Sequence, residues 1–99
     1  MNTHLDAVLT AVGDVAVFPL NDGIFTQAGC QYVSGAGTIQ LEATIDGDVW
    51  FTPKATIGGS SIGAQTGAGC DFLLIYGYSA LRYRKTVGTT PTVCAIGVC

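Results

Sequence analysis

Residues 38–50 read TIQLEATIDGDVW, and this stretch gives the clearest indication of how the chain folds. Apolar residues at positions 39, 41, 43 and 45 alternate with polar residues at 38, 40, 42 and 44, a period of two that places one face of a strand in a core. Asp46-Gly47 follows, a pair able to adopt the positive φ angles of a tight turn. Residues 48–52 predict the returning strand, so the whole stretch predicts a half-buried β-hairpin.

Short apolar and β-branched segments separated by glycine-rich turns continue this pattern along the chain. Pro19 indicates a strand end or a sheet edge, and Gly29 indicates a bulge or a close approach of another segment. Turns are expected at 21–23, 34–37 and 88–91, and further strands at 8–12, 14–20, 24–33, 72–76, 80–87 and 92–99. The sequence therefore predicts an all-β fold, a single small β-sandwich or jelly-roll-like domain of about seven to nine short antiparallel strands.

The 99 residues have room for one domain, because globular domains usually hold on the order of 100 residues or more. We therefore assign residues 1–99 to a single β-sandwich domain. Residues 1–10 are expected to form an N-terminal arm with room for one helical turn. Residues 57–69 are rich in glycine and serine, a composition that cannot bury much side-chain area, and they predict a long loop with room for one short strand.

The surface of this chain must carry few charges. Charged residues make up 11% of the sequence, against roughly 25% in a typical domain, and the formal net charge is −3. Such a surface favours burial against neighbouring subunits. The four basic residues are Lys54, Arg82, Arg84 and Lys85, and strand alternation directs Arg82 and Arg84 to the opposite face from Lys85. Because a nucleic-acid backbone needs a row of cations, we expect no nucleic-acid binding.

The N-terminal segment lacks the basic start and the continuous apolar stretch of a secretory signal. The best apolar run, residues 72–76, is far shorter than the roughly 18 residues of a membrane span. We therefore expect a soluble protein without a membrane partner, made in the cytoplasm.

Residues able to carry catalysis are few. His4 is the only histidine, and no serine or cysteine can be assigned to it from the sequence. The carboxylates are Asp6, Asp14, Asp22, Glu42, Asp46, Asp48 and Asp71. Most of them lie in or beside expected turns, where aspartate caps backbone amides, and no pair stands out for acid–base chemistry such as glycoside hydrolysis. The sequence therefore predicts that the protein is not an enzyme.

Metal and cofactor sites are not indicated either. Asp46-Gly47-Asp48 could offer two oxygens to calcium, but a calcium site normally takes about six or more ligands, and turn chemistry explains the motif more simply. The glycines at 35–37 and 58–59 lack the strand–helix context and the lysine of a phosphate-binding loop. We expect no metal and no cofactor.

The aromatic residues leave a binding function open. Trp50, Phe51, Tyr76, Tyr78 and Tyr83 could present a flat aromatic platform to a sugar. Core packing is the other interpretation, and it is the favoured one for Trp50. Direct sugar titration separates the two.

Four cysteines, Cys30, Cys70, Cys94 and Cys99, are possible disulfide residues. None of them has the two-residue spacing of zinc knuckles or redox motifs, so zinc is not indicated. In a reducing cytosol they would be small hydrophobes, but Cys99 is the last residue and its thiol can reach a neighbouring chain. A phage particle released by lysis meets oxidising surroundings, where disulfides could form after assembly. The three possible intramolecular pairings stay open.

The stretch 38–50, together with residues 80–86 (ALRYRKT) and the Gly/Thr turn after them, resembles small β-sandwich structural proteins of tailed bacteriophages. In those proteins a strand ends in an Asp-Gly-x-x-Trp-like hairpin, and a later strand carries alternating arginines. This chain departs from the pattern in its four cysteines and in Lys85, where an apolar residue would be expected. Similar hairpins also occur in carbohydrate-binding sandwiches.

The resemblance implies a structural virion protein, located in the virion, with a capsid decoration (cement) subunit as the first candidate. Such a subunit bridges neighbouring subunits, so the implied partners are further copies of itself, as a homo-oligomer such as a trimer, and major capsid or other virion proteins. A neck, collar or tail accessory protein and a carbohydrate-binding adhesion module are the alternatives. The residues expected to carry the packing are Ile39, Leu41, Ile45, Trp50, Phe72, Leu74 and Leu81.

Overall fold

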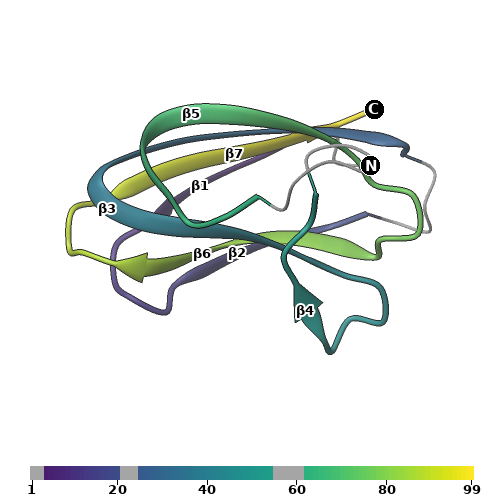
Figure 1. Ribbon diagram of the computed structural model, residues 1–99, viewed down its shortest axis with the longest axis horizontal. Helices are drawn as coiled ribbons and strands as arrows, with labels where there is room; N and C mark the ends of the chain where they lie inside the picture. Colours follow the sequence, from purple (N-terminus) through teal and green to yellow (C-terminus); the bar gives the residue numbers. More distant parts are fainter. Residues whose placement is uncertain (1–3, 21–24, 55–61) are drawn as a thin grey trace.

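Figure 1 shows the computed structural model of the chain, which describes residues 4–20, 25–54 and 62–99. Every regular element in these ranges is a β-strand, and all strand pairs are antiparallel. The strands are β1 (His4–Leu9), β2 (Val15–Pro19), β3 (Gln27–Thr44), β4 (Trp50–Phe51), β5 (Gln65–Leu74), β6 (Ala80–Val87) and β7 (Thr92–Val98). The predicted all-β fold of about seven to nine antiparallel strands is confirmed, with seven strands in the described residues, although β3 is long and not short.

The two layers of the fold share one long strand, β3. Its first part pairs with β7 on one side and β5 on the other, whereas its second part pairs with β6 and β4. Adding β1 beside β7 and β2 beside β6 gives the strand order β1-β7-β3-β6-β2. We call β1, β7, β5 and the first part of β3 the first layer, and β2, β6, β4 and the second part of β3 the second layer. Figure 1 shows β3 curving at one end from the layer of β7 and β5 into the layer of β6 and β2.

The bend in β3 lies where the sequence predicts a turn at 34–37. The strand does not end there, and that part of the prediction is wrong. Its register with β5 shifts between Val33 and Gly35 and again between Gly35 and Ile39, and Gly35 has a φ of 57°. Because β3 is paired with other strands before and after the register shift, the chain stays extended through it. The glycines therefore bend the strand from one layer into the other and do not end it.

The core lies between the two layers. Ile39, Leu41 and Leu81 are completely buried, as predicted, while Trp50 and Leu74 are half-buried. Ile45 and Phe72 were expected in the core, but they are 65% and 70% exposed. Ile45 lies beyond the end of β3 at Thr44, where strand alternation no longer applies, and Phe72 lies on the solvent side of β5 because alternation turns Leu73 inward.

Three segment predictions need correction. Residues 4–9 form β1, paired with β7 throughout, instead of a free arm or a helical turn. Leu5, Ala7 and Leu9 face the core and hold this strand in place. The expected loop at 57–69 falls partly on 55–61, outside the described residues, but β5 already begins at Gln65. The turn predicted at 21–23 also lies outside the described residues. The strand predicted to begin at residue 24 begins at Gln27, as the start of β3.

Glu42 and two arginines form a polar cluster on the solvent side of the second layer. Glu42 Oε1 accepts hydrogen bonds from Arg82 Nε at 2.9 Å and Arg84 Nε at 3.0 Å. Burial alone would raise the pKa of Glu42, but the hydrogen bonds and charges of the two arginines outweigh it and hold that pKa below its usual value. Arg82 and Arg84 thus lie opposite to Lys85, which is buried, as alternation predicted.

We expect Glu42→Gln to lower the free energy of unfolding by about 1–2 kcal/mol at pH 7. Because the pKa of Glu42 is lower in the folded protein than its ordinary value of 4.5, the ionised carboxylate stabilises the fold at any pH above 4.5. This stabilisation is lost as the pH falls through the lower pKa of the folded state. Urea unfolding at pH 7 and pH 3 should therefore show the difference between wild type and variant shrinking toward acid. Asp48→Asn, which removes an exposed carboxylate, is the control; a pH-independent Glu42→Gln difference would contradict the assignment.

Tyr83 brings a hydroxyl group into the core without a hydrogen-bond partner among the described residues. Its side chain is fully buried, and burial raises its pKa above the usual value. We expect Tyr83→Phe to raise the free energy of unfolding by about 1 kcal/mol, because the desolvated hydroxyl is removed and the ring stays. Thermal unfolding beside Tyr76→Phe, whose ring is exposed, tests this; a loss of stability in Tyr83→Phe alone would reveal a bond to the hydroxyl.

Candidate assembly surface

One side of the first layer is open to solvent, and we call it the outer face. It consists of the outward-pointing residues of β1, β7, the first part of β3, and β5. The strand registers arrange them in three rows that cross the sheet. The rows are Val8, Val93, Val33 and Ala68; then Asp6, Ala95, Gln31 and Cys70; then His4, Gly97, Gly29 and Phe72.

The first row is an apolar strip across the sheet. Val8, Val93 and Val33 lie side by side on three strands and are 59%, 52% and 58% exposed. Single exposed valines are normal on protein surfaces, but contiguous apolar surface marks a place where another molecule packs. The strip therefore makes the outer face the best candidate for a contact surface.

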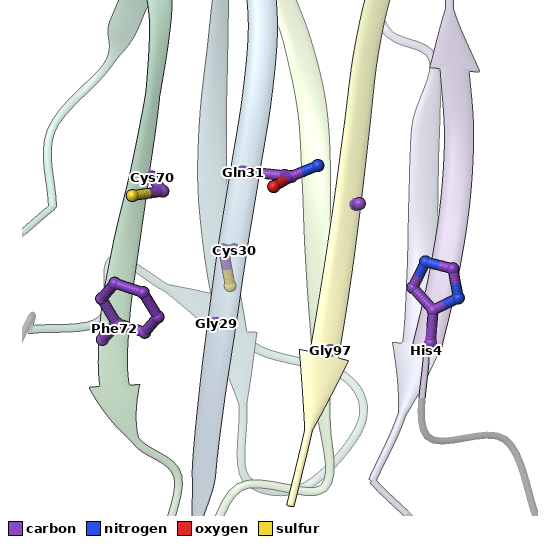
Figure 2. A pocket seen from close by; sticks show the side chains of 8 residues that line it. His4, Gly29, Cys30, Gln31, Cys70, Phe72 and Gly97 are labelled. Carbon is purple, nitrogen blue, oxygen red and sulfur yellow. The ribbon is translucent and has the colours of Figure 1, made fainter.

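The middle and third rows together line a shallow hollow that adjoins this strip. Gly29 and Gly97 lie at its floor, with Phe72 on β5 and His4 on β1 at its two sides, as Figure 2 shows. A Cβ atom at position 29 would lie 3.2 Å from Phe72 Cε1, so Gly29 leaves room for a side-chain ring and not for the close approach of another backbone segment. The register on both sides of Gly29 is regular, and the alternative of a bulge there is wrong.

The polar groups of the outer face are few. His4 Nε2 lies 3.0 Å from Asp6 Oδ1, and both side chains are more than half exposed. Gln31 lies in the middle row. Within the described ranges, no three histidine, cysteine or carboxylate groups lie close enough together to hold a metal ion. The hollow, about 330 Å³ in volume, is therefore lined mainly by apolar and backbone groups.

The four predicted disulfide cysteines lie on two sides of the same layer, and all are free thiols. Cys30 and Cys94 face the core, where burial raises the pKa of Cys30 to about 12 and that of Cys94 to about 11. Cys70 and Cys99 are exposed. The register places no two cysteines opposite each other: Cys30 faces Asp71 and Ile96, and Cys70 faces Gln31. Disulfide formation stays a prediction, and the exposed pair is the one available to another chain.

The carboxylates in the turns do what the sequence indicated. Asp46 Oδ1 accepts hydrogen bonds from the N–H groups of Asp48 and Val49 at 2.8 and 2.9 Å, and these bonds hold the pKa of Asp46 below its usual value. Asp14 caps the N–H groups of Thr10 and Ala11 in the same way. Asp71 accepts a bond from Gln65, and Asp22 lies outside the described residues. Turn capping thus accounts for Asp46-Gly47-Asp48.

The aromatic residues do not come together as a platform. Arg82 covers the ring of Trp50, with 4.1 Å between the guanidinium carbon and the ring centroid. Tyr83 is in the core, and Tyr78 packs edge-on against Phe51 with 5.4 Å between ring centroids. Tyr76 is exposed and apart from these contacts. Each ring therefore has a structural role or stands alone.

Sequence reasoning did not find the outer face. Val8, Val33 and Val93 belong to three strands far apart in the chain, and only the register aligns them. Strand alternation alone could have shown that each valine points outward, because the residues before and after it face the core.

No helix in the described part of the chain is both long and apolar enough to cross a membrane.

No protein-family model and no curated protein sequence matches the chain. The crystal structure of the SPBc2 prophage-derived protein YomS aligns with a TM-score of 0.60 and 15% identity, covering 100% of this chain and 97% of YomS. A chain from Bacillus endospore appendages, which form disulfide-linked pili, aligns with a TM-score of 0.46 and 10% identity, covering 94% and 80%. The protein therefore shares its fold with YomS.

Proposed function

We propose that this protein is a structural virion protein of a tailed phage, a capsid decoration subunit that stabilises the shell by packing between neighbouring subunits. The observation that carries the proposal is the outer face, with its strip of three adjacent exposed valines and a shallow hollow beside it. Contiguous apolar surface of this kind suits a permanent protein contact.

The energetics favour a bridging position over a single contact. Burying the rest of Val8, Val33, Val93 and Phe72 contributes on the order of 1 kcal/mol for each side chain. Association itself costs roughly 4 kcal/mol or more, so one such face binds one neighbour weakly. A subunit that contacts two or more neighbours at once gains from their high effective concentration, which is how a decoration subunit stabilises a shell.

The shared fold with YomS supports a phage origin for the chain, because YomS is described as prophage-derived. The proposed mechanism requires no catalysis, metal or cofactor, and the proposed location is the virion. A neck, collar or tail accessory role uses the same face and is the alternative within this class. The adhesion alternative is less well supported, because the ring of Trp50 is covered by Arg82.

The composition of phage particles tests this function. We expect particles released by the bacterium that carries the gene, purified on a density gradient, to contain the chain in many copies by mass spectrometry. Gold-labelled antibody should then bind the heads of these particles; labelling confined to the neck or tail would select the accessory alternative. Absence of the chain from the particle fraction would contradict a virion role.

A further inference from the structure

Strand β5 has one edge with no partner strand among the residues that the structure describes. Within the described ranges it pairs only with β3, so its other side carries backbone groups that no described strand bonds. Its sequence, QTGAGCDFLL, contains no lysine and no proline, and Asp71 is its one charge. Natural edge strands are usually blocked by such residues, since an open edge readily accepts another strand.

The hydrogen bonds around β3 show which groups of β5 point to the open edge. Gln27 and Cys99 exchange both of their backbone bonds, and Ile75 N–H donates to Thr26 O. Because bonding direction alternates along a strand, odd-numbered residues of β3 bond to β7 and even-numbered ones bond to β5. The register then directs the backbone groups of Gly69, Asp71 and Leu73 to β3 and leaves those of Ala68, Cys70 and Phe72 facing outward.

The side chains of β5 are arranged in two unlike halves around Cys70. The three residues before it, 67–69, are glycine or alanine, and the three after it, 71–73, are larger. In an antiparallel pair of two β5 strands related by a two-fold axis at Cys70, each larger residue meets a small one of the second copy. The pairs are Ala68 with Phe72, Gly69 with Asp71, and Gly67 with Leu73, with Cys70 opposite Cys70. An axis one residue later would instead place the two Asp71 carboxylates opposite each other, which is unfavourable.

We propose that two copies of the chain pair through β5, antiparallel about a two-fold axis at Cys70, and so join their first layers into one continuous sheet. Such an isologous contact closes as a dimer and can combine with the outer-face contacts in a larger assembly. This proposal rests on the proposed function for its role, because it supplies the self-contact of a homo-oligomeric virion subunit. The two Cys70 thiols would lie opposite each other, with about 5.5 Å between their Cα atoms.

Amide hydrogen exchange on the wild-type protein, followed by NMR over a dilution series, tests the pairing directly. The amides of Gly69, Asp71 and Leu73 should be protected at every concentration, because they bond to β3. Those of Cys70 and Phe72 should exchange at least about tenfold more slowly in concentrated protein, where the second strand covers them. Equal, rapid exchange of Cys70 and Phe72 at all concentrations, with no dimer by light scattering, would overturn the proposal.

A size swap tests the register. Ala68→Phe places two large side chains opposite each other and should weaken dimerisation at least about tenfold. The double variant A68F/F72A exchanges the large and small positions and should recover most of that loss, whereas a purely structural defect would not be recovered. Near-UV circular dichroism checks that each variant is folded. Failure of the double variant to recover the dimer would overturn the register.

Cross-linking of thiols adds a position-specific readout. A short bismaleimide, which joins two thiols by addition, should link Cys99→Ser into covalent dimers through Cys70, while Cys70→Ser should give few. Dimers from Cys70→Ser alone would place the contact at Cys99 and overturn the pairing at β5. Neither result bears on whether the chain is found in phage particles, so the two proposals fail separately.

Discussion

Replacing Lys85 by alanine is expected to lower the free energy of unfolding by about 3–5 kcal/mol, which is a large share of the stability of a small domain. Lys85 is completely buried in β6, on the core side. Its Nζ donates hydrogen bonds to Thr92 Oγ1 at 2.7 Å and to the backbone oxygen of Thr90. Alanine leaves these oxygens without their donor and opens a cavity along the length of the lysine chain.

Lys85→Met is the matched control. Methionine refills most of the volume and brings no charge into the core, so the loss of two hydrogen bonds is offset by the absence of a buried cation. We expect this variant to stay within about 1.5 kcal/mol of wild type. Chemical denaturation of the three proteins measures the difference. Equal losses for alanine and methionine would mean that the hydrogen bonds, not the packing, dominate at this position.

Gly88→Ala is expected to lower the free energy of unfolding by about 3 kcal/mol, for two separable reasons. Gly88 lies just after β6 with a φ of 95°, a conformation that side-chain-bearing residues rarely adopt. A Cβ atom there would also lie 3.0 Å from the Cα of Gly37, in the bend of β3. Because that neighbour is backbone, it can move aside only by distorting the bend.

Gly13→Ala separates the two causes. Gly13 has a nearly identical φ of 97°, but a Cβ atom there meets nothing within 4 Å. This variant should therefore lose only the conformational part, roughly 1–2 kcal/mol. Thermal and urea unfolding of both variants gives the comparison. A Gly13→Ala loss as large as that of Gly88→Ala would show that the contact between Gly88 and Gly37 contributes little.

The sequence predicted the parts of the fold that local alternation determines. Residues 80–87 were expected as a strand, and β6 has those bounds. The hairpin around Asp46-Gly47 is also confirmed, because Thr44 pairs with Trp50 and Ala43 with Phe51. Its connection spans residues 45–49 and is not a tight turn, and the returning strand is shorter than the predicted 48–52. In both segments the period of two and the turn chemistry point to the same structure, and no distant segment opposes them.

The failures arise where distant segments decide the outcome. The glycines at 35 and 37 are typical of a turn, yet β3 runs through them because β5, β6 and β7 pair with it on both sides of the bend. The apolar run 72–76 predicted a buried strand, but nothing in the described residues covers the outer face at Phe72. The intrinsic conformational preference of a residue is weak compared with the effect of strand pairing and burial.

The candidate site could be predicted only in part. The scarcity of charge indicated a surface made for burial, and the exposed cysteines were named in advance. The location of that surface required the register, which brings Val8, Val33 and Val93 into one strip. Lys85 appeared as an anomaly in an inward position, and its acceptors, Thr90 in the following turn and Thr92 at the start of β7, became visible only in the fold.

Incorporation of an outer-face variant into phage particles tests the central claim most directly. Val93→Lys places a charge in the middle of the valine strip, and Val49→Lys places one at a somewhat more exposed position in the turn between β3 and β4. Quantitative mass spectrometry of gradient-purified particles should find Val93→Lys reduced at least about tenfold and Val49→Lys close to wild type. Wild-type levels of a folded Val93→Lys protein in the particles would contradict assembly through the outer face.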